Sequence, residues 1–119
     1  ILKRGANMCL FCKIAVKEIP SSVVFENENI IAFNDINPQA PVHILIIPKK
    51  HIPTLNDVTK DDMAVIGEIY SVIPEIAKAA GVAEDGYRVV GNCNKNGGQE
   101  VYHIHFHLMG GRKFLWPAG

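Results

Sequence analysis

The most restrictive feature of this chain is a run of histidines near its C-terminus. Residues 103–109 read His-Ile-His-Phe-His-Leu-Met. Successive side chains of a β-strand point to opposite faces, so the three histidines are predicted to share one face and the apolar residues the other. The apolar face would pack on a core. Because three unpaired imidazoles are costly to bury, the histidine face is predicted to line a functional site.

Two kinds of site could use such a face. Histidines on one strand can bind zinc, but same-face neighbours lie about 6.8 Å apart and the outer pair about 13.6 Å apart, so one ion would not easily reach all three. Alternatively, each imidazole takes its own role around a phosphate, as nucleophile, orienting group or proton donor. Gly97 and Gly98 come shortly before the run and would let backbone N–H groups approach an anion. This combination favours a phosphate site.

The composition narrows the class of protein. The 119 residues fit a single domain with one core. Lys+Arg and Asp+Glu both number 12, so we expect no nucleic acid and no membrane as a partner. There is no apolar run of membrane-spanning length, and three cysteines do not form an even disulfide framework, so a cytoplasmic protein is expected. Met8 is a plausible natural start, which makes residues 1–7 an appended segment and 8–119 the domain.

Hydrophobic periodicity predicts an α+β domain with a five-stranded, mostly antiparallel sheet, one long helix and a short N-terminal helix. Thr59 and Asp62 resemble a capping box, Gly81 is placed to end the long helix, and Pro74 inside it predicts a kink or a break. The predicted helices cover 9–16 and about 63–80. The predicted strands cover 22–26, 29–33, 43–47, 87–92 and 101–109, with 93–100 as a loop before the last strand.

Residues 98–109, Gly-Gln-Glu-Val-Tyr-His-Ile-His-Phe-His-Leu-Met, resemble the histidine-triad (HIT) motif, in which three histidines alternate with apolar residues. The similarity extends to residues 19–20, 33–36, 38–41, 48–52, 86–88 and 116–119, and so spans Cys9 to the C-terminus. A histidine at the third position favours the nucleoside phosphoramidase branch over the nucleotidyltransferase branch, which has glutamine there. The resemblance implies a single HIT domain over 8–119 and a hydrolase that cleaves the bond at the α-phosphate of AMP- or GMP-linked amines.

The resemblance also implies a role for each site residue. His105 would attack the phosphorus and form a covalent nucleotidyl-histidine, His107 would contact the phosphate or leaving group, and His103 would orient the nucleophile's surroundings. His43 is expected to hydrogen-bond near the triad without reacting. Glu100 stands where some members have a serine, and an ionised carboxylate cannot donate a hydrogen bond as serine does. The nucleotide-binding residues implied are Leu10, Phe11, Ile14, Phe33 and Leu45 for the purine, Asp35 and Ile36 for the ribose, Asn92, Gly98, Gln99 and Glu100 for the phosphate, together with Val101 and Trp116.

The pair Cys9-x-x-Cys12 has three interpretations. A redox pair of thioredoxin type would need a βαβ unit, which the sequence does not predict. Two reduced thiols without a ligand are the second interpretation, and a closed tetrahedral zinc site with two further ligands is the third. The resemblance supplies candidates for those ligands, since some bacterial relatives bind zinc with positions that correspond to His51 and His103. Such a zinc would be structural, with no cofactor required for catalysis.

The resemblance further implies a homodimer joined through the long helix and an edge strand, with Trp116 reaching the partner protomer's site. Two other functions stay open at this point. One is a regulatory module that binds nucleotides with little turnover. The other is a zinc hydrolase centred on the histidine run, which the strand geometry disfavours.

Overall fold

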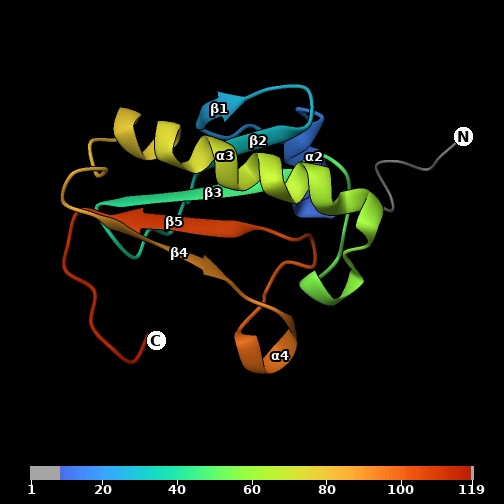
Figure 1. Cartoon of the computed structure of the whole chain (residues 1–119). Helices are drawn as coiled ribbons and strands as arrows, with labels where there is room; N and C mark the ends of the chain where they lie inside the picture. Colours follow the sequence, from blue (N-terminus) through green and yellow to red (C-terminus); the bar gives the residue numbers. More distant parts are fainter. Residues whose placement is uncertain (1–8, 119) are drawn as a thin grey trace, which may run out of the picture.

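Five antiparallel strands, in the order β1-β2-β3-β5-β4, form the frame of the molecule (Figure 1). The computed structural model describes residues 9–118. The predicted α+β class with a five-stranded sheet, one long helix and a short N-terminal helix is confirmed. The strands are β1 (Val23–Glu26), β2 (Ile30–Asn34), β3 (Val42–Pro48), β4 (Tyr87–Gly91) and β5 (Phe106–Gly110).

One face of the sheet is covered by α3 (Met63–Ala79) (Figure 1). A capping box at Thr59 and Asp62 forms a short 3-10 turn just before α3, and Gly81, with φ of 79°, follows its end as predicted. The predicted break at Pro74 does not occur, and α3 continues through that position as one 17-residue helix. The core between helix and sheet combines apolar side chains of alternate strand positions with those of one side of α3. The strands contribute Ile30, Ile44, Ile46, Phe106 and Leu108, and α3 contributes Ile69 and Ile73.

The opposite face carries α2 (Leu10–Ala15), which leaves part of the sheet uncovered. Phe11 and Ile14 of α2 pack on a second apolar cluster formed by the other alternate positions of β2 and β3, Ile31, Phe33, Leu45 and Ile47. Since side chains alternate along a strand, His43 of β3 and His107, which pairs with Leu45 across the sheet, belong to this face. The face opposite α3 therefore holds the histidines.

The last predicted strand is shorter than expected. Residues 101–105 lie outside it, and a short helix, α4 (Asn94–Gly97), occupies the predicted loop. The physical reason is a change of hydrogen-bond partner: Ile104 N–H donates to Ile52 O at 2.6 Å, and the His103 ring bonds Pro48 O at 2.7 Å. The segment thus runs along residues 48–54 and joins the ladder with β3 and β4 only from Phe106.

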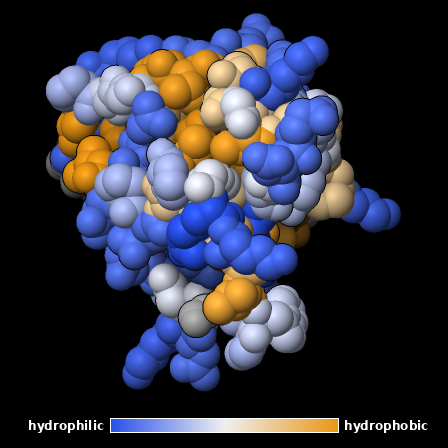
Figure 2. All heavy atoms as spheres, turned by 90° about the vertical axis from the view of Figure 1, so that its left-hand side faces the viewer, coloured by the Kyte–Doolittle hydropathy of each residue, from blue (hydrophilic) through white to orange (hydrophobic). Residues whose placement is uncertain are grey.

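On the side where α3 ends, hydrophobic residues gather in the upper half of the surface, and most of the lower half is hydrophilic (Figure 2). Within residues 9–118, no helix has the length and apolar character needed to cross a membrane. The segment 1–7 and Met8 lie outside the described residues.

Candidate functional site

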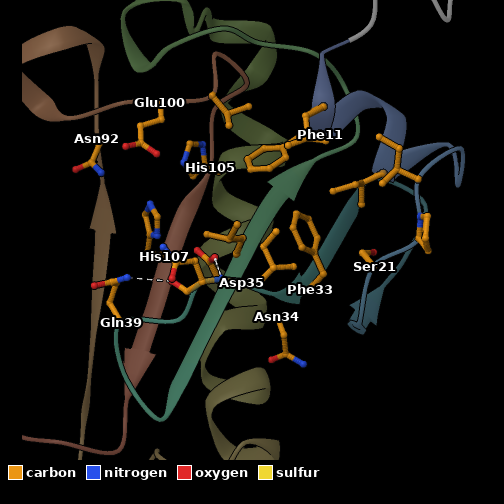
Figure 3. Close-up of a pocket in the computed structure, with 18 of the residues that line it drawn as sticks. Phe11, Ser21, Phe33, Asn34, Asp35, Gln39, Asn92, Glu100, His105 and His107 are labelled. Atoms are coloured by element: carbon orange, nitrogen blue, oxygen red, sulfur yellow. Dashed lines mark hydrogen bonds between the residues drawn. The ribbon is translucent and has the colours of Figure 1, made fainter.

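A cavity of about 550 Å³ opens on the sheet face opposite α3, between α2, the strands and the segment that follows α4 (Figure 3). Its floor and one wall are apolar, and the imidazoles of His105 and His107 stand at the other side (Figure 3). Most of the residues predicted for a nucleotide line this cavity, namely Leu10, Phe11, Ile14, Phe33, Asp35, Ile36, Leu45, Asn92, Gly98, Glu100, Val101, His105 and His107.

His105 is held as a neutral imidazole with a defined tautomer. Its Nδ1 lies 2.7 Å from His103 O, and because a carbonyl only accepts, Nδ1 carries the proton and Nε2 keeps its lone pair. The ring is buried and meets the Phe11 ring edge-on at 5.1 Å between centroids. Burial lowers the pKa of His105, so Nε2 stays unprotonated at neutral pH. This arrangement fits a nitrogen nucleophile.

His107 has the opposite tautomer. Gln39 N–H donates to His43 Nδ1 at 2.9 Å, so the proton of His43 is on Nε2, which donates to His107 Nδ1 at 2.9 Å. His107 Nε2 must then carry a proton in the neutral ring. Burial, with further contributions from His105 and His43, lowers the pKa of His107 to about 4. Asp35 Oδ2 lies 3.4 Å from His43 Nε2 and is the alternative acceptor for that N–H.

The two rings are close enough to act on one group, since the centroids of His105 and His107 are 5.0 Å apart. One nitrogen offers a lone pair and the other an N–H. The predicted hydrogen bond of His43 within this neighbourhood is confirmed.

His103 does not share the cavity with the other two histidines, contrary to the expectation of one histidine face. It lies in the segment before β5, and its fully buried ring turns toward α2. Its Nε2–H donates to Pro48 O at 2.7 Å, which leaves the Nδ1 lone pair facing the cysteines. The influence of His103 on His105 is exerted through its backbone carbonyl.

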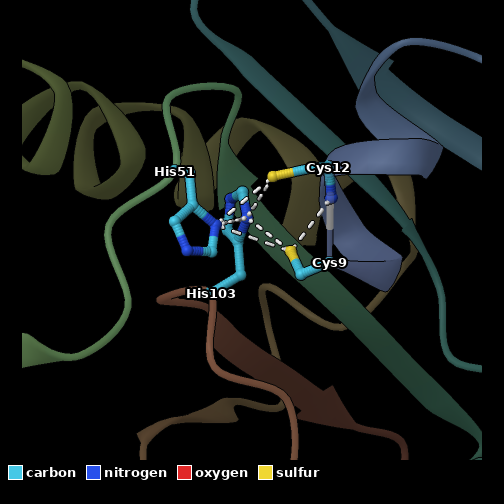
Figure 4. A group of neighbouring side chains, drawn as sticks. All are labelled: Cys9, Cys12, His51 and His103. Atoms are coloured by element: carbon cyan, nitrogen blue, oxygen red, sulfur yellow. Dashed lines mark hydrogen bonds between the residues drawn. The ribbon is translucent and has the colours of Figure 1, made fainter. Parts of the chain in front are cut away.

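Around His103 Nδ1, three other potential metal ligands converge (Figure 4). His51 Nδ1 and Cys9 Sγ each lie 3.3 Å from His103 Nδ1, and Cys12 Sγ lies 3.4 Å from it. The four ligand atoms are all within 4.8 Å of one another. A tetrahedral zinc site with bonds of about 2.0–2.3 Å has ligand–ligand distances of roughly 3.3–3.8 Å. The residues therefore fit a divalent metal bound by two thiolates and two imidazoles.

Cys9 and Cys12 are brought together by the start of α2. Cys9 is the N-cap of the helix, and its Sγ accepts a hydrogen bond from Cys12 N–H at 3.3 Å. The spacing of the two thiols is thus set by the helix cap.

Two predicted residues lie outside the cavity. Gln99 is buried, its Oε1 accepts from Asn94 N–H at 2.8 Å, and its Nε2 donates to Pro53 O at 2.8 Å. These bonds hold the loop behind the cavity. Trp116 is 84% exposed and does not line the cavity.

The sequence did not single out six residues that line the cavity. Gln39 is part of the Pro38-Gln39-Ala40-Pro41 turn and holds His43 through its backbone N–H, which the proline-rich pattern could have suggested. The others lie where the chain returns from α2 to β1 and leaves β2, and they are Ile19, Pro20, Ser21, Asn34 and Asn37. Ile19, Pro20 and Asn34 belong to segments that share the family resemblance, which could have suggested them, whereas Ser21 and Asn37 had no such signal.

Comparison with known proteins agrees with this geometry. The chain is 52% identical over 107 residues to the purine nucleoside phosphoramidase of Escherichia coli (strain K12), covering 90% of each chain. It is 47% identical to protein HitA of Neisseria gonorrhoeae, covering 86% of this chain and 94% of HitA. The crystal structure of a HIT family hydrolase from Legionella pneumophila Philadelphia 1 superposes with a TM-score of 0.92 at 60% identity, covering 94% of this chain and all of the other. A profile of the HIT domain matches residues 16–114, and the chain belongs to this family.

Proposed function

We propose that the protein is a purine nucleoside phosphoramidase, a hydrolase that cleaves the P–N bond of AMP- or GMP-linked amines. The observation that carries the proposal is the pair His105 and His107, one with a free lone pair and one with an N–H, 5.0 Å apart at the end of an apolar slot. The name of the Escherichia coli relative supports the same reaction.

The cavity matches the parts of a purine nucleotide. Phe11, Phe33 and Leu45 offer an apolar slot of the kind that takes a flat base. Asp35 Oδ1 accepts from Asn37 N–H at 2.8 Å and keeps lone pairs that can accept from the ribose hydroxyls. Gly98, with φ of 81°, brings backbone close to the place of the phosphate, next to Asn92. The Glu100 carboxylate can accept from the N–H of the substrate amine.

The reaction would proceed in two steps. His105 Nε2 attacks the phosphorus while the P–N bond breaks, and His107 gives a proton to the leaving nitrogen. Water then attacks the phosphorus, loses a proton to His107 and releases His105. Because the pKa of His107 is about 4 without substrate, the proton would be taken up with the substrate, whose negative phosphate favours the charged imidazole.

The variant His105→Asn tests this function. We expect kcat/KM for an adenosine phosphoramidate to fall by at least about 1000-fold, with the Kd of AMP changed less than about threefold, because a nucleophile acts in the transition state more than in ground-state binding. Lys78→Gln, an exposed change on α3, is the control and should keep wild-type turnover. Turnover of His105→Asn within tenfold of wild type would contradict the assignment. A wild-type protein that binds AMP and turns over no phosphoramidate would favour the regulatory module.

We also propose a structural zinc ion bound by Cys9, Cys12, His51 and His103. A closed set of four ligands leaves no position for a catalytic water, so the ion would supply only a link between α2 and the segment that carries His105. The distances of 3.3–3.5 Å among the ligand atoms support it.

Metal content and thermal stability test the zinc proposal. Cys9→Ser should lose most of one bound zinc per chain and lower Tm by roughly 5 °C or more, since each kcal/mol shifts the Tm of a small domain by about 4–8 °C. Cys93→Ser is a matched control, because Cys93 lies outside the cluster. Freshly purified protein without zinc would contradict the proposal and leave two ordinary thiols.

We further propose a cytoplasmic homodimer joined through α3 and β4. β4 is at the edge of the sheet, and edge strands offer unpaired backbone groups. Met63, Gly67, Tyr70 and Pro74 repeat at helical spacing on an exposed side of α3. Cys9, Cys12 and Cys93 form no disulfide with one another, which is consistent with a reducing compartment.

A further inference from the structure

A second cavity, of about 830 Å³, adjoins the first beside β4, α4 and the C-terminal residues 112–118. The two cavities share four lining residues, Gln39, Asn92, Gly98 and His107. His105 lines only the first cavity, whereas His107 lines both. The proton-bearing ring therefore stands at the boundary between them.

The position of this boundary matters for the reaction. In an in-line displacement, the leaving group departs from the side of the phosphorus opposite the attacking nitrogen. With His105 in the first cavity and His107 at the boundary, the second cavity is on the way out for the leaving amine. Nothing in the nucleotide itself requires this second space.

The two cavities have opposite charge. The first is lined by Asp35 and Glu100 and by no lysine or arginine. The second is lined by four cations, Arg88, Lys95, Arg112 and Lys113, and by no aspartate or glutamate. Since acidic and basic residues balance at 12 each over the whole chain, this separation is a local property of the site.

Two of the cations are fixed in place. The guanidinium groups of Arg88 and Arg112 lie over the Phe114 ring, at 5.2 and 4.3 Å from its centroid. Arg88 also donates to Leu115 O at 3.1 Å, and Arg112 donates to Gln39 O at 3.2 Å. Within residues 9–118, none of the four cations forms an ion pair with a carboxylate, so their charge is available to a ligand.

We propose that the second cavity is a leaving-group subsite that selects amines carrying an anionic group, a carboxylate or a phosphate. The proposal rests on the phosphoramidase function and specifies its substrate class. His105 Nε2 bonds to phosphorus, the P–N electron pair leaves with the amine, and the amine nitrogen takes its proton from His107. Its anionic end meanwhile contacts Lys95, Lys113 and the two guanidinium groups. Water then attacks the phosphorus, the bond to His105 Nε2 breaks, the proton of the water passes to His107, and AMP is released.

Matched substrates test the charge preference. Adenosine phosphoramidates of β-alanine, β-alaninamide, phosphoethanolamine and 1,3-diaminopropane carry leaving groups of similar length that are negative, neutral, negative and positive. We expect kcat/KM to be about tenfold higher for β-alanine than for its amide, the order of one charge-assisted hydrogen bond. The ratio of kcat/KM between the β-alanine and the phosphoethanolamine substrates shows whether a carboxylate or a phosphate is the preferred anion. The diamine should be the poorest substrate.

Removal of the cations should abolish the preference. Lys95 and Lys113 are both exposed, so the double variant Lys95→Gln/Lys113→Gln should fold. In it we expect kcat/KM for the β-alanine substrate to fall most of the way to the value for the β-alaninamide substrate, whose own kcat/KM should change less than about twofold. Added salt at 0.5 M should reduce the advantage in the wild type by screening. The control Lys60→Gln/Lys78→Gln removes the same charge at exposed positions that line neither cavity and should keep the preference. Equal turnover of acid and amide by active wild-type protein would overturn the subsite, whereas absence of turnover for all four would overturn the phosphoramidase function.

Discussion

At the scale of single residues, the site depends on backbone groups that fix the proton of each imidazole. His103 O and Pro48 O each accept from one ring nitrogen, and Gln39 N–H donates to another. These partners do not titrate, so the tautomers of His103, His105 and His43 are set by the fold. The other ring nitrogens then present a lone pair to the cavity in His105, a lone pair to the cysteines in His103, and an N–H to His107 in His43.

The pair formed by the buried His43 and the half-buried His107 makes stability depend on pH. Burial lowers the pKa of both, for His107 to about 4, so the unfolded chain binds more protons than the native protein below pH 6.5. The contribution of His107 is therefore present above pH 6.5, falls as pH decreases, and is lost near pH 4. Allowing for the partial solvent contact of His107, we expect the free energy of unfolding to fall by roughly 1 kcal/mol between pH 7 and pH 5 on its account.

Urea unfolding of His107→Gln measures this contribution. The glutamine retains a hydrogen-bond acceptor but does not titrate, so its unfolding free energy should change less between pH 7 and pH 5 than that of the wild type. Met109→Leu changes a neighbouring side chain on the same strand without any titration and should keep the wild-type slope. Both proteins are compared free of metal. Identical slopes for wild type and His107→Gln would show that the pair does not resist protonation.

At the scale of elements, local patterns predicted most of the frame. The apolar period of α3, its capping box and Gly81 gave its limits closely, because each signal is local to the helix. The first three strands followed from short β-branched runs between turn residues. Of the kink or break predicted at Pro74, an exposed position, the break does not occur, because a helix in a packed protein can lose one backbone hydrogen bond and remain intact.

The segment before β5 shows where local patterns fail. Its alternation is faultless over residues 103–109, yet only the part from Phe106 joins the sheet. In this segment the Ile104 N–H and the His103 ring bond instead to Ile52 O and Pro48 O, partners about fifty positions earlier in the chain. That choice turns the His103 ring toward Cys9 and Cys12 and away from the cavity. A strand pattern cannot specify such a partner, since it fixes faces and not neighbours.

Sequence resemblance identified the cavity better than the pattern did. Thirteen of the fifteen nucleotide-binding residues it implied line the cavity, and the two exceptions are Gln99 and Trp116. Gln99 follows Gly98 in the same loop, but its side chain turns inward to Pro53 O. The second cavity was not foreseen, because Arg88, Lys95 and Arg112 come together only when β4, α4 and the C-terminal segment meet.

At the scale of the whole molecule, one side of the sheet is used for chemistry and the other for structure. The core between α3 and the sheet holds the strands, while the cavities and the Cys–His cluster occupy the remaining face and its end. The outer side of α3 and the free edge of β4 have neither role. These two surfaces are next to each other. If each met its own copy across a twofold axis, the sheet and the helix layer would continue into a second chain.

Gly67 offers a sharp test of the proposed homodimer. It lies in the exposed stripe of α3 between Met63 and Tyr70, and a Cβ added there meets nothing within 4 Å in the protomer. Gly67→Arg should therefore fold normally, since arginine has a better helix propensity than glycine, while its side chain blocks the approach of a second helix. Sedimentation velocity at 10 μM concentration should give a dimer for the wild type and a monomer for Gly67→Arg, with similar circular dichroism. Ala79→Arg adds the same side chain at an exposed position on another side of α3 and should remain dimeric. A wild type that sediments as a monomer, or a Gly67→Arg variant that stays dimeric, would exclude α3 as the interface.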